Sequence, residues 1–194
     1  MKTVILKYNS GNVRSVSFAL ERIGINAIVT DNEEEILSAD KIILPGVGEA
    51  SGAMKYLKEK KMDDLICALN QPVLGICLGM QLFCRFSEEG NTNCLGIFDQ
   101  EVKLFPPGEL KVPQIGWNTI NELSTGLFKN VKENTYQYLV HSYYVELGAN
   151  TIAQTNYGIN YSTAIQKNNF YGVQFHPEKS GLTGQTILEN FIKL

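Results

Sequence analysis

The first half of the chain alternates short apolar runs with stretches of helical spacing. The apolar runs predict strands at Val4–Lys7, Asn26–Thr30, Lys41–Leu44 and Pro72–Ile76. Between them, apolar positions three and four residues apart predict helices at Val13–Ile23, Glu49–Glu59 and Met62–Leu69. Strands that alternate with helices form parallel sheets with helices on both faces, and we expect that arrangement here.

The second half has a different pattern, with short β runs separated by loops. These runs predict strands at Val102–Leu104, Tyr136–Val140, Thr151–Gln154, Ser162–Gln166 and Phe170–Phe175. They favour an antiparallel extension of the sheet, and a last helix is expected at Thr183–Ile192. The 194 residues carry no repeat or linker. The fold class predicted is therefore one α/β domain over residues 1–194, with a mixed, mostly parallel central sheet flanked by helices in three layers.

Composition narrows the range of partners. The net charge of −3 argues against binding to nucleic acid or to an anionic membrane. The apolar run near the N-terminus is too short for a signal peptide, no stretch reaches the length of a membrane span, and we expect a cytoplasmic protein. The four cysteines form no CxxC pair and do not cluster with histidine, so neither a metal nor a disulfide framework is predicted.

A candidate nucleophile follows the fourth predicted strand, in Gly75-Ile76-Cys77-Leu78-Gly79. Glycines two residues before and two after Cys77 allow the sharp strand-to-helix turn that exposes a reactive side chain. A helix beginning near Leu78 directs unpaired N–H groups at the sulfur, which favours thiolate and an oxyanion. Taken alone, the segment fits a buried structural cysteine equally well.

A cysteine nucleophile needs a histidine as its base, and the chain has two. His176 follows the Phe170–Phe175 run and precedes Pro177, so we expect it to be the last extended residue of its strand. Glu178, two positions later, then shares its side and orients the imidazole. His141 is the rival base, but no carboxylate follows it at extended spacing until Glu146.

The segment Pro45-Gly46-Val47-Gly48 follows the third predicted strand. Its backbone, at Val47 or Gly48, is a candidate oxyanion donor, with the Leu78 N–H as the second. Without Cys77 the segment would be read as a simple turn into a helix. All these groups follow strands, and ligands of such sheets bind at the carboxyl ends of the strands, so one crevice is expected to hold them.

These motifs resemble the class I glutamine amidotransferases, whose glutaminase site is a Cys-His-Glu triad. The resemblance rests on residues 75–81 together with His176-Pro177-Glu178, and it covers the chain from Val4 onward. Three further segments, at 45–50, 111–118 and 141–145, narrow it to the family of glutaminase subunits of imidazole glycerol phosphate synthase. Gln114 departs from the pattern, since this family often carries histidine there, and we interpret the change as affecting partner contacts.

The resemblance implies roles that residue patterns alone do not give. Cys77, His176 and Glu178 would be catalytic, and glutamine would be bound by Gly46, Gln81, Glu89, Ser142 and Tyr143. For Glu89 the sequence by itself favours a solvated turn. Trp117, the single tryptophan, is expected in a loop with Pro113, Gly116 and Asn118. It is either a core residue of the second-half sheet or an interface anchor. The resemblance favours the interface, with Asn12, Asn118, Tyr138 and Lys179 as further partner-facing residues.

The implied reaction is hydrolysis of glutamine to glutamate and ammonia without a metal or an organic cofactor. The ammonia would pass to a (β/α)₈-barrel cyclase subunit in a heterodimer of histidine biosynthesis, which makes imidazole glycerol phosphate and aminoimidazole carboxamide ribotide. Three alternatives stay open: a paralogue that feeds an enzyme amidating a surface sugar, the glutaminase of vitamin B6 synthesis, and a regulatory subunit that binds glutamine without catalysis. Residues Val112–Asn118 argue against the second, and the complete triad argues against the third.

Overall fold

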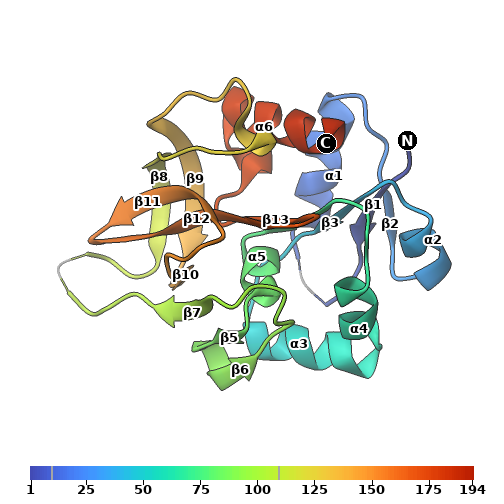
Figure 1. Ribbon diagram of the computed structural model, residues 1–194, viewed down its shortest axis with the longest axis horizontal. Helices are drawn as coiled ribbons and strands as arrows, with labels where there is room; N and C mark the ends of the chain where they lie inside the picture. The colour runs from blue at the N-terminus through green and yellow to red at the C-terminus, as the bar shows by residue number, and fades with distance from the viewer. Residues whose placement is uncertain (10, 109) are drawn as a thin grey trace.

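The computed structural model describes residues 1–9, 11–108 and 110–194, and its centre is a twisted mixed sheet (Figure 1). Among these residues the strand order is β2-β1-β3-β4-β13-β12-β10-β7-β5-β6, and β11 pairs with β12. The first strands are β1 (Thr3–Leu6), β2 (Ile28–Thr30), β3 (Lys41–Leu44) and β4 (Val73–Ile76). They are joined by β5 (Phe86–Ser87), β6 (Thr92–Asn93), β7 (Glu101–Leu104), β10 (Tyr143–Val145), β11 (Thr151–Tyr157), β12 (Ile159–Lys167) and β13 (Phe170–Val173).

The sheet has a parallel part and a largely antiparallel part, as the sequence predicted. β1, β2, β3, β4 and β13 pair in parallel. From β13 outward, β12, β10 and β7 pair antiparallel. β13 therefore lies at the junction, with β4 on one side and β12 on the other. The strand that precedes the predicted base is thus the direct neighbour of the strand that precedes the predicted nucleophile.

Helices cover both faces of the sheet (Figure 1). One face carries α1 (Val13–Arg22) and α6 (Gly181–Lys193), and the other carries α3 (Ala50–Glu59), α4 (Met62–Cys67) and α5 (Leu78–Phe83). Successive strand residues point to opposite faces. Accordingly Ile5, Ile43 and Leu74 belong to the apolar core beneath α1 and α6. Val4, Ile42 and Val73 belong to the core beneath α3, α4 and α5.

Most predicted elements are present, with ends shifted by a few residues. The short helix α2 (Glu33–Leu37) was not predicted, although Asn32 caps it by accepting a hydrogen bond from the Glu35 N–H at 3.0 Å. Its five residues are too few for helical periodicity to appear. Among the described residues, no helix is long and apolar enough to cross a membrane.

The prediction that Trp117 lies in a loop is wrong. Residues Gln114–Ile120 form strand β8, which pairs antiparallel with β9 (Thr135–His141) in a separate two-stranded sheet. Pro113 and Gly116 suggested a loop, but the proline lies just outside the strand, and Gly116 has a φ of +133° that only glycine adopts readily. Trp117 is 55 % exposed, which also excludes its assignment to the core.

Candidate active site

Cys77 lies on a strained turn between β4 and α5. Its φ of 54° and ψ of −108° are rare for a residue with a side chain, and such strain gathers at functional sites. The two flanking glycines are required by space. A Cβ on Gly79 would lie 2.0 Å from the Leu44 carbonyl oxygen, and one on Gly75 would lie 2.5 Å from the Phe83 ring. This packing is the strand-turn-helix geometry expected of a nucleophile elbow.

His176 and Glu178 meet, although by a different route from the one predicted. Strand β13 ends at Val173, and Pro177–Lys179 form a 3₁₀ turn, η3. The backbone of His176 is extended, with φ −99° and ψ 93°, but the chain then turns. His176 Nδ1 lies 2.8 Å from Glu178 Oε1. The contact therefore arises from one tight turn and not from the alternation of an extended strand.

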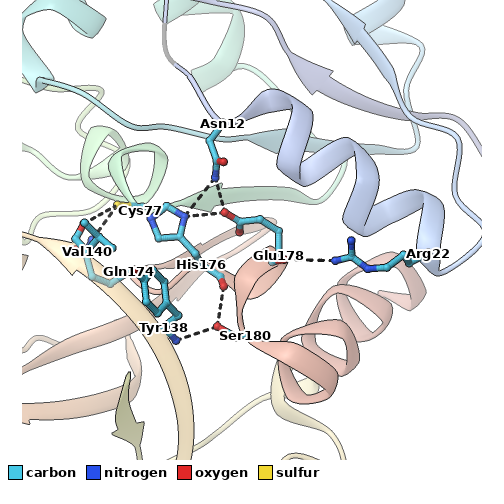
Figure 2. Close-up of polar contacts among 9 residues, drawn as sticks. All are labelled: Asn12, Arg22, Cys77, Tyr138, Val140, Gln174, His176, Glu178 and Ser180. Atoms are coloured by element: carbon cyan, nitrogen blue, oxygen red, sulfur yellow. Dashed lines mark hydrogen bonds and ion pairs between the residues drawn. The ribbon is translucent and has the colours of Figure 1, made fainter. Parts of the chain in front are cut away.

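The charge on His176 follows from its neighbours (Figure 2). Because Nδ1 donates to the Glu178 carboxylate, Nε2 is left for Cys77. Burial acts to lower the pKa of His176, but hydrogen bonds to Cys77 and Glu178 and the charges of both raise it to about 10. A protonated imidazole is thereby favoured beside the sulfur, and such a cation stabilises a cysteine thiolate.

His141 lies in the interior, in a different environment. Its Nδ1 is 2.7 Å from the Tyr143 carbonyl oxygen, so Nδ1 carries the proton, and Nε2 is 3.3 Å from the Tyr161 hydroxyl. Burial lowers the pKa of His141 to about 4, against the opposing effect of the Tyr143 hydrogen bond. Nδ1 is engaged by the Tyr143 carbonyl oxygen, and among the described residues no carboxylate is hydrogen-bonded to the ring. His141 is therefore poorly suited to be the base.

Gln114 belongs to this same interior network. It is 3 % exposed, and its Oε1 accepts a hydrogen bond from the Tyr161 hydroxyl at 2.9 Å. The interpretation that its departure from the family pattern affects partner contacts is therefore wrong. In this protein Gln114 is an internal acceptor beside His141.

A cavity of about 320 Å³ opens over Cys77 at the carboxyl ends of the strands. Predicted site residues make up most of its lining: Val47, Gly48, Cys77, Leu78, Gln81, Glu89, Ser142, Tyr143, His176 and Lys179. Pro113, Val140 and His141 complete it. The described residues contain no cluster of three or more potential metal ligands. The crevice expected from the strand ends is thus formed, and its size suits an amino acid.

Two polar side chains that line the cavity, Gln81 and Glu89, are each held by hydrogen bonds. Gln81 Nε2 donates to the Tyr143 carbonyl oxygen at 2.9 Å and to Gln174 Oε1 at 3.0 Å, which fixes the amide and directs its oxygen elsewhere. Glu89 is half-buried, and its Oε2 accepts a hydrogen bond from the Ala50 N–H at 2.7 Å. Burial raises the pKa of Glu89, against the effect of the Ala50 hydrogen bond. Both oxygens are acceptors of the kind that hold an ammonium group.

The loop after β3 packs directly against the elbow. The Tyr8 hydroxyl donates to the Pro45 carbonyl oxygen at 2.5 Å, which fixes the start of the loop. A Cβ on Gly46 would lie 2.7 Å from both Leu78 Cβ and the Tyr8 hydroxyl. Gly48 has a φ of +114°, which only glycine adopts readily. Leu78 is the first residue of α5, so its N–H has no acceptor within the helix.

Two side chains lie beside Cys77, His176 and Glu178 although the sequence analysis did not place them there. Gln174 is completely buried, and its Nε2 lies 3.6 Å from the Cys77 sulfur. It precedes His176 by two residues, so strand alternation was a usable signal for it. Asn12 was expected to face a partner, but its amide contacts His176 and Glu178. Asn12 and His176 are far apart in sequence, and no local pattern joins them.

Of the remaining residues expected to face a partner, two lie on the exposed face of the β8–β9 hairpin, one lies at the cavity, and one lies on the other face of β8. Trp117 and Tyr138 are cross-strand partners on β8 and β9, with ring centroids 5.8 Å apart. Lys179 is exposed at the edge of the cavity. Asn118 lies on the opposite face of β8 from Trp117, and its amide donates to the Asn156 carbonyl oxygen at 2.9 Å. The exposed face of the hairpin therefore includes Trp117 and Tyr138 but not Asn118.

Comparison with known proteins assigns the class. Residues 4–194 match the family model described as glutamine amidotransferase class-I, and the chain belongs to this family. Curated relatives within it are imidazole glycerol phosphate synthase subunits HisH. The subunit of Bacteroides fragilis is 56 % identical over the whole of both chains. The subunit of Vibrio parahaemolyticus is 44 % identical, over all of this chain and 98 % of its own.

Solved structures support the fold. One described as a glutamine amidotransferase superimposes with a TM-score of 0.77 and is 18 % identical, over all of this chain and 98 % of its own. A glutamine amidotransferase from Thermotoga maritima has a TM-score of 0.65 and 17 % identity, over all of this chain and 83 % of its own. At such identities the likeness concerns the fold alone. The three-layer arrangement with a mostly parallel sheet is thus the one predicted from the sequence.

Proposed function

We propose that this chain is the glutaminase subunit of an imidazole glycerol phosphate synthase of histidine biosynthesis, acting in the cytoplasm. The observation that carries the proposal is the Cys77–His176–Glu178 group at the base of an amino-acid-sized cavity. Full-length relatives at 44–56 % identity named as HisH subunits support the pathway over a paralogue that serves a surface sugar. Nothing in the site favours the regulatory alternative, because the elbow and the His176–Glu178 pair are both formed.

The first half of the reaction forms a thioester. The Cys77 thiolate attacks the side-chain carboxamide carbon of glutamine, so a carbon–sulfur bond forms and the carbonyl oxygen becomes an oxyanion. The Leu78 N–H and an N–H of the Val47–Gly48 loop are proposed to bind this oxyanion. His176 Nε2 then gives its proton to the departing nitrogen. The carbon–nitrogen bond breaks and ammonia leaves.

The second half releases glutamate. A water molecule attacks the γ-glutamyl thioester while His176 Nε2 accepts its proton, and the carbon–sulfur bond breaks to restore the thiolate. Glu178 holds the Nδ1 proton throughout, so Nε2 is the nitrogen that exchanges protons in both halves. The acceptor oxygens of Gln81 and Glu89 are proposed to hold the α-ammonium group of glutamine, and backbone near Ser142 its α-carboxylate.

The proposed partner is a (β/α)₈-barrel cyclase that receives the ammonia. Support comes from the hairpin of β8 and β9, whose outer face bears the exposed side chains Ile115, Trp117 and Tyr136. Exposed aromatic residues of this kind are enriched at the centres of protein interfaces. Lys179 lies at the cavity edge and offers a cation to the same partner.

A reconstitution with the cyclase tests the function. The wild-type complex is expected to make imidazole glycerol phosphate from glutamine or from added ammonia, whereas a Cys77→Ala complex uses ammonia alone. Cys84→Ala is the matched control, because that buried cysteine lies outside the cavity. It should retain use of glutamine. Glutamine hydrolysis by a folded Cys77→Ala complex would refute the proposal, as would a wild-type complex that uses ammonia but not glutamine.

A further inference from the structure

Asn12 occupies the N-cap position of α1 but does not cap that helix. Asparagine at this position normally accepts a hydrogen bond from a backbone N–H of the first turn, as Asn32 does at α2. Asn12 instead has a left-handed backbone, with a φ of 73°, and its side chain makes no capping hydrogen bond. Asparagine tolerates that backbone better than most residues. The amide is therefore turned away from the helix and is available for another interaction.

The amide of Asn12 lies against the His176–Glu178 pair (Figure 2). Its Nδ2 donates to Glu178 Oε1, the oxygen that also accepts from His176 Nδ1 at 2.8 Å. Nδ2 is 3.4 Å from Nδ1 itself. Both nitrogens carry protons, so this last contact is a close approach of two donors that share one acceptor. Among the described residues, the other oxygen of the carboxylate, Oε2, is buried without a hydrogen-bond partner.

The orientation of Glu178 thus depends on two donors at a single oxygen. A buried carboxylate is stable as an anion only when it is hydrogen-bonded, and charged hydrogen bonds are the stronger kind. One donor, His176, is the group that Glu178 has to orient. Asn12 is the donor that is independent of the reaction. Without it, Oε1 would be held only by the imidazole that changes its charge during each turnover.

We propose that Asn12 is a positioning residue for glutamine hydrolysis, which holds Glu178 Oε1 against His176 Nδ1 from the N-terminus of α1. The inference rests on the proposed function, because it assigns Asn12 to that reaction. It differs from the expected role of Asn12 as a partner contact. A partner contact affects affinity, whereas a positioning residue affects turnover at saturating partner.

The amide also shares the negative charge of Oε1 with the imidazole. Its removal leaves that charge to His176 alone, so the imidazolium is held more strongly and loses its proton at higher pH. Among the described residues, the other titratable or charged groups around the pair are Cys77, His141, Lys179 and Arg22. Nη2 of Arg22 lies 3.4 Å from the Glu178 carbonyl oxygen. None of these groups changes in the variants of residue 12, so a shift in their pH profiles reports on that residue.

Two variants separate donation from shape. Asn12→Gly removes the amide and accepts the left-handed backbone without strain. Asn12→Asp keeps the shape but replaces the donor with an anion facing Glu178. Asn32→Gly is the matched control, since it makes the same change at a residue that does cap its helix. Glutamine turnover is measured against pH at saturating cyclase. In the isolated chains, alkylation of Cys77 by iodoacetamide is measured against pH, with Cys77→Ser to subtract the other thiols.

We expect Asn12→Gly to lower kcat roughly tenfold, the effect of one hydrogen bond to a charged group, and Asn12→Asp to lower it further. KM should change little, because Asn12 does not line the cavity. The alkaline step of both pH profiles should move upward from wild type to Asn12→Gly and again to Asn12→Asp. Asn32→Gly should match wild type in turnover and in both profiles.

The proposal is overturned if Asn12→Gly weakens cyclase binding alone, so that saturating cyclase restores wild-type turnover and the profiles stay unchanged. It is also overturned if Asn32→Gly lowers turnover as much as Asn12→Gly. Failure of the proposed function looks different: the wild-type complex itself would not hydrolyse glutamine. Alkylation of Cys77 in the isolated chain still tests Asn12 in that case, because it requires no glutamine.

Discussion

The backbone N–H of His176 donates to the carbonyl oxygen of Tyr138 at 2.9 Å. Ser180 strengthens the link, since its hydroxyl oxygen accepts from the Tyr138 N–H at 3.0 Å and donates to the His176 carbonyl oxygen at 2.7 Å. The strand whose outer face carries Tyr138 is therefore tied to the residue that we propose as the base. A protein bound to the outer face of β9 would therefore contact a strand that is hydrogen-bonded directly to His176.

The first prediction concerns this link. Ser180→Ala leaves the part-buried Tyr138 N–H without its acceptor, at a cost of about 1–3 kcal/mol. It also removes the hydroxyl bridge between Tyr138 and His176, so that only their backbone hydrogen bond still joins β9 to His176. We expect the cyclase to stimulate glutamine turnover of this variant less than that of wild type, by about tenfold or more. Ser124→Ala, whose hydroxyl bonds Ile152 away from the site, should be stimulated normally. Equal stimulation of both variants would show that the Ser180 hydroxyl does not carry the effect of cyclase binding from β9 to His176.

The exposed face of the hairpin is tested by Trp117→Ala. The indole is 55 % exposed and packs edge-on against Tyr138, so its loss should weaken cyclase binding by about 2 kcal/mol or more while the fold stays intact. Titration calorimetry measures the affinity. Leu182→Ala removes a more exposed apolar residue on α6 and should leave the affinity unchanged. An unaltered affinity for Trp117→Ala would place the interface elsewhere.

The pKa of about 10 at His176 predicts how stability varies with pH. A histidine whose pKa is raised on folding stabilises the protein fully below its unfolded value, about 6.5, and this contribution is lost as pH rises through the folded value. The free energy of unfolding of wild type should therefore exceed that of Glu178→Gln most clearly near pH 6, and the difference should shrink toward pH 10. Urea unfolding at a series of pH values gives the measurement. A difference that grows with pH would contradict the assignment of charges.

His141 predicts the opposite dependence at acid pH. Its pKa is lowered to about 4, so the contribution of the neutral ring is complete above about 6.5 and is lost as pH falls through 4. The loss should amount to about 3 kcal/mol, and it should be absent from His141→Asn. This variant should also keep much more glutaminase activity than His176→Ala. If His141→Asn is the more damaging of the two changes, the base has been assigned to the wrong histidine.

The tight packing around the turn at Cys77 gives a prediction that can be checked against a control glycine elsewhere in the chain. Gly79→Ala places a methyl group 2.0 Å from the Leu44 carbonyl oxygen, so β3 and α5 would have to separate. We expect a loss of about 3 kcal/mol or more in the free energy of unfolding, together with loss of activity. Gly52→Ala makes the same change within α3, where nothing lies within 4 Å, and should stabilise the protein by roughly 0.5–1 kcal/mol. Comparable changes in the free energy of unfolding for Gly79→Ala and Gly52→Ala would mean that the turn accommodates a methyl group at residue 79.

The sequence predicted the parallel half of the sheet and the tight turn at Cys77 because both depend on local features. Apolar runs mark buried strands, and two glycines around Cys77 mark a tight turn. The second half was harder, because Pro113 just before β8 and Gly116 within it suggested a loop, and pairing with β9 is the main support of that strand. The contact of Glu178 with His176 was foreseen, but its cause was not, since a 3₁₀ turn of three residues leaves no periodic signal.

The sequence did not predict contacts between segments that are far apart along the chain. Asn12 and Glu178 meet only because α1 and η3 lie side by side in the folded chain, and a single sequence carries no information on that pairing. Gln114 shows the same limit. Its departure from the family pattern was interpreted as affecting partner contacts, but Tyr161, a residue distant in sequence, provides the buried partner that makes its burial stable.

The place of β13 in the sheet has a consequence for synthesis on the ribosome. Cys77 belongs to the first half of the chain, but its strand β4 cannot complete its pairing until β13 arrives. A nascent chain that has not reached residue 173 contains the elbow and β3 but lacks the complete β13, and His176 comes later still. Under the proposed mechanism, the Cys77 thiol is therefore made before the imidazole that would activate it, and a translation product that ends before His176 is expected to release no ammonia from glutamine.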